Sequence, residues 1–221
     1  MSSPADLALY SSLRRAMVDL QLRGRGITDE RVLDAMLRVP RHEFALERYR
    51  DQAYEDHPLP IGEGQTISQP YIVASMLEAL ALAPSDRILE IGTGSGYLSA
   101  VLAELTAQVV SIERHPGLAH SARQLLSSMG YNNVRVVTGD GSRGFPEAAP
   151  YDGIIASAAA PEAPRELVEQ LAEGGRMIIP VGREDAQQLQ LIEKRNGTPH
   201  TAWRELCRFV PMISGSDPSA S

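Results

Sequence analysis

Cysteine is almost absent from this sequence, because Cys207 is the one example among 221 residues. An internal disulfide needs two thiols, so none can form, and a metal site built from cysteines alone is excluded. Positive charge is scarce as well: 21 Lys and Arg residues stand against 28 Asp and Glu residues, a net charge of −7. A surface with this balance disfavours non-specific binding to nucleic acids or anionic membranes.

Membrane-spanning runs and metal-binding patterns are missing too. No apolar stretch approaches the roughly 20 residues that a bilayer span requires, and no leader pattern opens the sequence. The five histidines form no pair at the i,i+4 spacing of helical metal ligands, so we expect no metal site. We therefore expect a soluble cytoplasmic protein that is monomeric, with neither nucleic acid nor membrane as a partner.

Hydrophobic residues make up 43% of the sequence, which is enough for the core of one large domain. We expect this single domain to cover residues 1–213. Residues 1–83 would supply helices and a loop, and residues 84–213 would supply the ligand-binding core. The low-complexity segment 214–221 is expected to be disordered.

Three helices and a loop are expected ahead of the core. Leu9–Leu20 keeps its apolar residues on one helical face, and Thr28 has the residue type and position of the next N-cap. A third short helix would lie within Arg41–Arg50. Asp56–Gly64 is punctuated by prolines and glycines, which predicts a loop. These helices carry no site of their own and would form a cap packed on the main sheet.

Strand and helix patterns alternate through the rest of the chain. Apolar runs predict strands, and helical spacing appears between them, as at Leu118–Met129. The last two runs, Gln188–Glu193 and Arg204–Val210, predict an antiparallel pair. The other expected strands are Val109–Ile112, Val134–Thr138, Tyr151–Ala156 and Met177–Ile179. This alternation predicts a doubly wound, mostly parallel α/β sheet with ligands at the carboxyl ends of its strands.

The stretch Arg87–Leu98 gives the first indication of a ligand. Its apolar start predicts a buried strand, and Gly92, Gly94 and Gly96 then form a tight turn before a helix begins. Glycines let the backbone approach a ligand closely, and a helix N-terminus offers free N–H groups to an anion. A dinucleotide fingerprint requires glycine where Tyr97 stands, so a different ligand is favoured.

Acidic side chains at strand ends indicate which ligand suits this turn. Glu90 precedes the glycines, where a carboxylate would repel a pyrophosphate but suits the cationic S-adenosylmethionine. Glu113 ends the next strand about 20 residues later, the spacing of an acid that binds ribose hydroxyls. Asp140 follows the third strand and can accept a hydrogen bond from an adenine amino group. The expected cofactor-binding residues are Glu90, Gly92, Thr93, Gly94, Ser95, Gly96, Glu113, Asp140 and Gly141.

No catalytic base is evident in the sequence, which favours an acceptor that has no proton to lose. The fourth strand ends in Ala156–Pro161, without the Asn/Asp-Pro-Pro-aromatic run of amino-directed DNA methyltransferases. Cys207 follows Leu206, so the Pro-Cys nucleophile of cytosine chemistry is missing. A carboxylate is already ionised at neutral pH and needs only desolvation and alignment. Ser68, expected as the N-cap of a helix that contains Pro70, could align it.

The segment Pro58–Pro70 resembles the signature of the protein-L-isoaspartate O-methyltransferase family. Four shorter segments resemble the same family in chain order: Val39–Phe44, Gly139–Gly141, Ala149–Asp152 and Phe209–Pro211. The resemblance implies a seven-stranded, Rossmann-like sheet of the class I methyltransferase type, with its last two strands exchanged relative to other methyltransferases. It implies an enzyme that uses S-adenosylmethionine to methylate the free α-carboxylate of L-isoaspartyl residues in damaged peptides and proteins. The products would be S-adenosylhomocysteine and an ester that collapses to a succinimide and so starts repair.

By position, the resemblance also implies residue roles. Ser68 would be the active-site serine, and Thr66 and Ile67 would line the same pocket. Val210 would meet the substrate backbone, and an extended substrate along Phe209–Val210 would be fixed by main-chain hydrogen bonds. The residues that would contact the cofactor from this side are Gln65, Thr66, Ile67 and Ser68.

Three other interpretations stay open on the sequence alone. A methyltransferase-like binding protein without catalysis is disfavoured by the intact Glu90, Glu113, Asp140 and Ser68. An NAD-dependent oxidoreductase is disfavoured by Glu90 and Tyr97. A peptide aspartyl methyltransferase dedicated to one biosynthetic pathway would use the same chemistry on another target.

Overall fold

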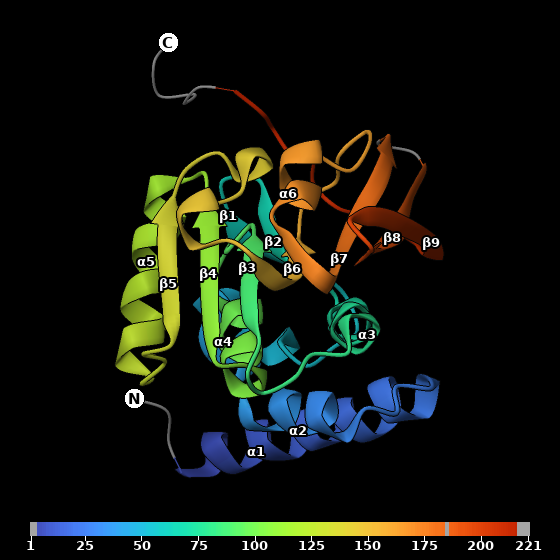
Figure 1. Ribbon diagram of the computed structural model, residues 1–221. Helices are drawn as coiled ribbons and strands as arrows, with labels where there is room; N and C mark the ends of the chain where they lie inside the picture. Colours follow the sequence, from blue (N-terminus) through green and yellow to red (C-terminus); the bar gives the residue numbers. More distant parts are fainter. Residues whose placement is uncertain (1–3, 184–185, 216–221) are drawn as a thin grey trace.

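The computed structural model describes residues 4–183 and 186–215, and its centre is a seven-stranded sheet (Figure 1). The strand order is β5-β4-β3-β6-β7-β8-β9. Strands β3 to β7 run parallel, whereas β8 is antiparallel to both of its neighbours. The strands are β3 (Arg87–Ile91), β4 (Gln108–Glu113), β5 (Val134–Thr138), β6 (Tyr151–Ala156), β7 (Leu171–Arg183), β8 (Ala186–Arg195) and β9 (Thr198–Cys207). The predicted doubly wound, mostly parallel sheet with a final antiparallel pair is confirmed.

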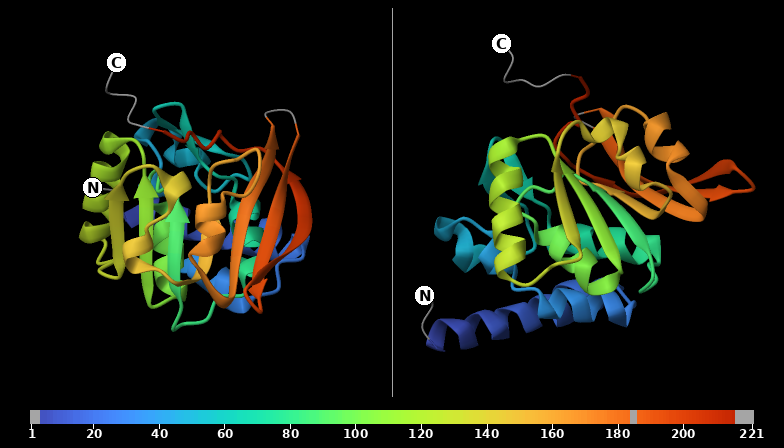
Figure 2. Two further views of the ribbon diagram at one scale, coloured as in Figure 1. Left: turned by 45° about the horizontal axis from the view of Figure 1, so that its top comes forward. Right: turned by 60° about the vertical axis from the view of Figure 1, so that its left-hand side comes forward.

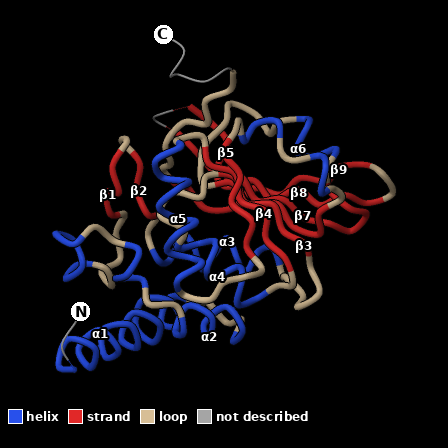
Figure 3. Tube along the Cα trace, turned by 90° about the vertical axis from the view of Figure 1, so that its left-hand side faces the viewer, coloured by secondary structure: helices blue, strands red, loops and turns tan. Residues whose placement is uncertain are grey.

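Helices cover both faces of this sheet. Figure 3 shows α3, α4 and α5 on one face and α6 on the other. α1 and α2 lie outside α3 and α4 and form the expected cap, which both views of the molecule show (Figures 1 and 2). The α-helices are α1 (Pro4–Ala16), α2 (Glu30–Arg38), α3 (Pro70–Leu80), α4 (Tyr97–Leu105), α5 (Pro116–Ser128) and α6 (Arg165–Glu169). A π-helical turn spans Met17–Leu22, and 3₁₀ turns span Arg23–Arg25, Arg41–Phe44, Glu47–Gln52, Gly141–Arg143 and Pro146–Ala148.

Side-chain alternation in the central strand β3 sends its residues to two separate cores. Ile88 packs in the core with α3, α4 and α5, whereas Leu89 and Ile91 pack in the core beside α6. Successive side chains of a strand point to opposite faces, and both faces of a parallel sheet are buried. The strand is therefore apolar almost throughout, and the same alternation puts Glu90 on the face that α4 covers.

The start of α2 differs from the expectation. Its N-cap is Asp29 and not Thr28, because the Asp29 carboxylate accepts hydrogen bonds from two backbone N–H groups of the first turn. The backbone nitrogen of Thr28 instead donates to Oε1 of Glu78 at 2.7 Å. Both residue types can cap a helix, and a tertiary contact with α3 decides which of them does.

The segment expected to be a loop contains half of a hairpin. Strand β1 (Leu59–Gly62) pairs antiparallel with β2 (Gln65–Ile67), and Gly62 takes a positive φ of 98° at the turn. Ser68 is not an N-cap, because α3 begins at Pro70 and the cap position belongs to Gln69, without a side-chain hydrogen bond. Ser68 therefore keeps its hydroxyl free for another role.

Two boundaries near the end of the chain also differ. β7 spans Leu171–Arg183, well beyond the expected Met177–Ile179, and β9 ends at Cys207, before Arg208–Val210. Among the described residues, no helix is both long and apolar enough to cross a bilayer. Most of the expected disordered tail, residues 216–221, lies outside the described residues, and the division at residue 83 stays a prediction.

Candidate active site

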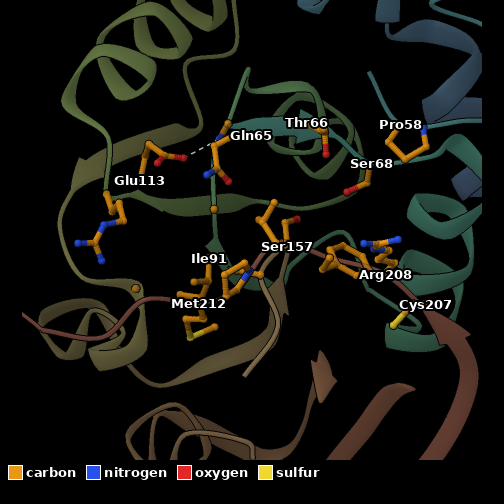
Figure 4. A pocket seen from close by; sticks show the side chains of 18 of the residues that line it. Pro58, Gln65, Thr66, Ser68, Ile91, Glu113, Ser157, Cys207, Arg208 and Met212 are labelled. Atoms are coloured by element: carbon orange, nitrogen blue, oxygen red, sulfur yellow. Dashed lines mark hydrogen bonds between the residues drawn. The ribbon is translucent and has the colours of Figure 1, made fainter. Parts of the chain in front are cut away.

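A cavity of about 360 Å³ opens at the carboxyl ends of β3 and β4 (Figure 4). One wall comes from β2 and the segment before α3, and the opposite wall comes from the segment that follows β9. Its lining includes Gln65, Thr66, Ser68, Ile91, Gly92, Gly94, Glu113, Gly141, Ser157, Cys207, Arg208, Phe209, Val210 and Met212. Parallel α/β sheets bind ligands at this edge, so the cavity lies where the strand pattern predicts a ligand.

The glycine turn gives the cavity room at its floor. Gly92 and Gly94 both line it and have positive φ angles of 92° and 55°. A Cβ on Gly92 would lie 3.4 Å from Cβ of Ser157, and a Cβ on Gly141 would overlap the side chain of Ile91. Side chains at these positions would fill the cradle that a ligand needs. Thr93, Ser95 and Gly96, also expected at the cofactor, do not line the cavity.

Glu113 lines the cavity and is 5% exposed. Its Oε2 accepts a hydrogen bond from the backbone nitrogen of Gly94 at 2.8 Å, and its Oε1 accepts one from the backbone nitrogen of His115 at 2.9 Å. Each carboxylate oxygen has a second lone pair, so the group can still accept hydrogen bonds from two neighbouring hydroxyls. This is the geometry expected of a ribose-binding acid.

Asp140 lies at a second cavity of about 650 Å³, which adjoins the first at Arg114. Its Oδ1 accepts hydrogen bonds from the backbone nitrogen and hydroxyl of Ser142, and its Oδ2 accepts one from Gly215 at 2.9 Å. Burial opposes ionisation, but these hydrogen bonds outweigh it and hold the pKa of Asp140 below its usual value. One lone pair of Oδ2 stays available for an amino group. Gly141, the next residue, lines the first cavity.

Glu90 does not reach either cavity, which corrects the expectation of a carboxylate facing a cationic ligand. Its side chain is 0% exposed and accepts a hydrogen bond from Ser99 of α4. Burial raises the pKa of Glu90 to about 8, so the group is mostly protonated at neutral pH. Strand alternation explains the error: Ile91, the next residue, points to the cavity side. Glu90 therefore links β3 to α4 through Ser99.

Ser68 contributes a hydroxyl to the cavity from the wall opposite Glu113, as Figure 4 shows. Among the described residues this hydroxyl has no hydrogen-bond partner, whereas the Ser68 carbonyl accepts one from Arg41 at 2.9 Å. Thr66 is exposed and Gln65 half-buried, and both line the cavity. Ile67 is 5% exposed and packs in the core, so the expectation that it lines the pocket is wrong.

The wall after β9 is held by the sheet. Gln187 of β8 donates to the Phe209 carbonyl at 3.0 Å and accepts from the Phe209 nitrogen at 2.6 Å. The Val210 carbonyl accepts a hydrogen bond from the nitrogen of Ala159 at 2.8 Å. Most main-chain groups of Phe209–Val210 are therefore already engaged, which leaves the N–H of Val210 as the donor available to a substrate. Of the main-chain hydrogen bonds expected between this segment and a substrate, only one from the N–H of Val210 can form without breaking an existing bond.

Among the described residues, the Ser68 hydroxyl has no hydrogen bond to a basic side chain that could take its proton. His115 lines the cavity, and its Nδ1 lies 3.9 Å from Oε2 of Glu63. In the part of the chain that the structure describes, its imidazole makes no hydrogen bond to Ser68. Burial raises the pKa of the Cys207 thiol to about 11, so it is not a thiolate. Within the described ranges no cluster of three metal-ligating side chains exists. The arrangement suits transfer to an acceptor that is already anionic.

Sequence relatives agree with this geometry. Residues 13–217 match the family described as protein-L-isoaspartate(D-aspartate) O-methyltransferase (PCMT). The protein-L-isoaspartate O-methyltransferase of Koribacter versatilis is 54% identical over 213 residues, which cover 96% of each chain. The chain belongs to this family. The protein-L-isoaspartate O-methyltransferase of Methanoculleus marisnigri is 54% identical over 200 residues, 90% of this chain and 91% of the relative.

A solved structure supports membership of the protein-L-isoaspartate O-methyltransferase family. It is a β-aspartate methyltransferase (PCMT) from Plasmodium falciparum, in complex with S-adenosyl-L-homocysteine. The TM-score is 0.80 at 28% sequence identity, and the match covers 90% of this chain and 98% of that one. In this chain the family signature Pro58–Pro70 forms the hairpin β1–β2 and the first residue of α3, the wall that carries Thr66 and Ser68.

Three residues that shape this cavity were not predicted from the sequence. Gln187 fixes the wall after β9, Ser157 packs beside Gly92, and Arg41 holds the main chain of Ser68. Gln187 and Arg41 are polar residues buried to 5% and 0% exposure. Their partners lie 22 and 27 residues away, so no local pattern marks them.

Proposed function

We propose that this chain transfers the methyl group of S-adenosylmethionine to the free α-carboxylate of L-isoaspartyl residues in damaged peptides and proteins. The observation that carries the proposal is the placement of the free Ser68 hydroxyl across one cavity from Gly92, Gly94 and Glu113. An acceptor beside Ser68 would face a cofactor held by the glycine turn. Family membership supports the same activity.

The residues present fit an adenosyl cofactor. Glu113 has lone pairs for ribose hydroxyls, Asp140 has one for the adenine amino group, and the glycines leave space for close approach. We propose Gly92, Gly94, Glu113, Asp140 and Gly141 as direct contacts. Thr93, Ser95 and Gly96 would shape the turn, and Gln65 would contact the cofactor from the hairpin. When bound, the cofactor supplies a methyl group activated by a sulfonium.

The chain's own part in the reaction is alignment. The acceptor carboxylate is ionised at neutral pH, so an oxygen forms the new bond to the methyl carbon without losing a proton. Ser68 donates a hydrogen bond that holds the other oxygen. Positioning of this kind can account for roughly 7–11 kcal/mol of a barrier in favourable cases. Ser68 has no activating histidine partner and does not act as a nucleophile. The neighbouring amide nitrogen of the substrate then attacks the ester carbonyl, methanol leaves, and a succinimide forms.

Paired peptides test the function. One peptide carries L-isoaspartate and the other normal aspartate at the same position, and labelled methyl transfer is measured as volatile methanol after base. The isoaspartyl peptide should be methylated and the aspartyl peptide largely ignored, because the extra methylene moves the carboxylate out of line, a displacement that can cost around 10²-fold in rate. Equal rates would overturn the repair function. Methylation confined to one peptide sequence would favour a pathway-specific enzyme.

The proposal includes a monomeric, cytoplasmic enzyme whose partners are isoaspartyl proteins and peptides, without a nucleic-acid or membrane partner. The net charge of −7 supports the absence of a nucleic-acid or membrane partner. Light scattering on the purified protein, with and without peptide, measures the oligomeric state. A stable dimer would contradict the monomer.

A further inference from the structure

Arg41 is a fully buried guanidinium behind the wall that carries Ser68. Its side chain is 0% exposed, yet it lies in the 3₁₀ turn Arg41–Phe44, far from Ser68 in sequence. Its Nε donates to the carbonyl of Ala53 at 2.8 Å, and its Nη2 donates to the carbonyl of Ser68 at 2.9 Å. The Arg41 side chain therefore connects the segments at Ala53 and Ser68, neither of which belongs to the seven-stranded sheet.

The same guanidinium also contacts the first residue of the helix that follows the glycine turn. Its Cζ lies 4.7 Å from the ring centroid of Tyr97, the first residue of α4 and the residue that follows the glycine turn. The Tyr97 ring is 1% exposed and packs edge-on against Phe44 of the Arg41 turn, with ring centroids 5.8 Å apart. Tyr97 cannot shift without disturbing both contacts. Arg41 thus bridges the acceptor wall and the start of the helix behind the glycine turn.

Burial of the Arg41 guanidinium has a high desolvation cost. Among the described residues Arg41 has no carboxylate partner within ion-pair distance, and its Nη1 has no hydrogen-bond partner. Burial also lowers the pKa of Arg41, against smaller opposing effects of Tyr97, Tyr54 and Asp56. A buried charge without a direct ion-pair partner costs more than an apolar residue of the same size, so stability alone does not explain the choice of arginine. The planar guanidinium explains the choice of arginine, because it can donate to two carbonyls and stack on an aromatic ring at the same time.

We propose that Arg41 is a positioning residue for methyl transfer, which sets the place of Ser68 relative to the glycine turn. The inference rests on the proposed function, because it concerns the alignment that Ser68 gives to the acceptor. Arg41 touches neither substrate nor cofactor and acts through the Ser68 main chain. Lysine cannot replace it fully, since one ammonium cannot reach both carbonyls and stack on Tyr97.

A double-mutant cycle tests the coupling. Arg41→Met should lower kcat on the isoaspartyl peptide by tenfold or more and leave the cofactor dissociation constant within twofold. In a Ser68→Ala background the same change should lower kcat by less than threefold, because residues that act through one another are not additive. An equal loss in both backgrounds would overturn the proposal. Arg41→Lys should recover part of the kcat, and it serves as the test variant if Arg41→Met does not bind cofactor.

Arg31→Met is the matched control. Arg31 also donates to two carbonyls, those of Leu82 and Leu105, but far from the cavity. It should lower the melting temperature without changing kcat, and a similar kcat loss in both arginine variants would reduce Arg41 to a general structural role. Hydrogen exchange gives a readout that does not depend on turnover: amides of residues 66–69 should exchange faster in Arg41→Met and not in Arg31→Met. Unchanged exchange there overturns the proposal even if the isoaspartyl peptide proves not to be the substrate.

Discussion

The Oε2 atom of Glu113 lies 2.8 Å from the backbone nitrogen of Gly94 and accepts its hydrogen bond. The acid at the end of β4 therefore holds the glycine turn at the end of β3. The other oxygen accepts a hydrogen bond from the backbone nitrogen of His115, the residue before α5. One carboxylate orders both loops that would meet the ribose, so the cradle is organised before the cofactor arrives.

Replacement of Glu113 by Gln keeps the size of the side chain but turns one acceptor into a donor. We expect cofactor binding to weaken by about 1–3 kcal/mol, or roughly 5–150-fold, because a ribose hydroxyl loses its acceptor and the Gly94 N–H loses its anchor. Calorimetry with S-adenosylhomocysteine measures the change. Asp86→Asn, which alters a turn acid that bonds Ala83 outside the cavity, is the control. An unchanged affinity in Glu113→Gln would remove Glu113 from the ribose site.

Asp140→Asn tests the adenine contact. Asp140 already uses Oδ2 for the N–H of Gly215, so an adenine amino group must share or replace that bond. We expect cofactor affinity to fall by about 5–150-fold, since the amide offers a donor where an acceptor is needed. Adenosine should lose the same factor, whereas methionine should not bind differently. Asp152→Asn, an acid that bonds only the backbone of Arg87, is the matched control. Equal affinities in the two variants would place the adenine elsewhere.

Much of the sheet could be predicted because its strands are continuous apolar runs. Val134–Thr138 and Tyr151–Ala156 were predicted with the bounds that the structure has. The hairpin β1–β2 was missed because its prolines and glycines have the composition of a loop, and its pairing depends on the partner strand. The cap at Asp29 was missed because Glu78, on another helix, engages Thr28.

The site was predictable where chain position determines side-chain position. Glu113 lies at the cavity and Asp140 at the adjoining one because the ends of parallel strands share one edge of the sheet. Glu90 was placed wrongly, since one residue of strand register decides which face a side chain meets. Arg41 and Gln187 act through contacts between distant segments, which no motif records.

Glu90 should make the stability of the protein depend on pH. Burial raises its pKa from 4.5 to about 8, so the folded state binds more protons than the unfolded state between these values. The free energy of unfolding should therefore fall as pH rises from about 5 to 8. Glu90→Gln imitates the protonated carboxyl, and its advantage over the wild type should grow by roughly 2–4 kcal/mol across that interval.

Urea unfolding at pH 5, 6, 7 and 8 measures this difference. Glu104→Gln is the control, because Glu104 lies on the same helix α4 and pairs with Arg38 at 2.7 Å on the surface. It should follow the pH dependence of the wild type. Parallel curves for Glu90→Gln and the wild type would contradict the raised pKa of Glu90.

Ser68→Ala should separate alignment from cofactor binding. The Ser68 hydroxyl has no partner among the described residues and faces the cavity, so its removal leaves no buried group unpaired and should not weaken the fold. We expect kcat on the isoaspartyl peptide to fall about 10–100-fold while cofactor affinity stays within twofold. Thr66→Val, which removes the neighbouring exposed hydroxyl of the same wall, should cost less than fivefold.

Mass spectrometry decides whether Ser68 positions the acceptor or reacts with it. A positioning hydroxyl stays unmodified through turnover, because the methyl group passes directly to the substrate carboxylate. Mass spectrometry of the quenched wild-type enzyme should therefore find the peptide that contains Ser68 at its unmodified mass. A methylated or acylated Ser68 that appears and decays with turnover would make it a covalent participant. If Thr66→Val lost more activity than Ser68→Ala, the aligning hydroxyl would belong to Thr66 instead, because both residues lie on the same wall of the cavity.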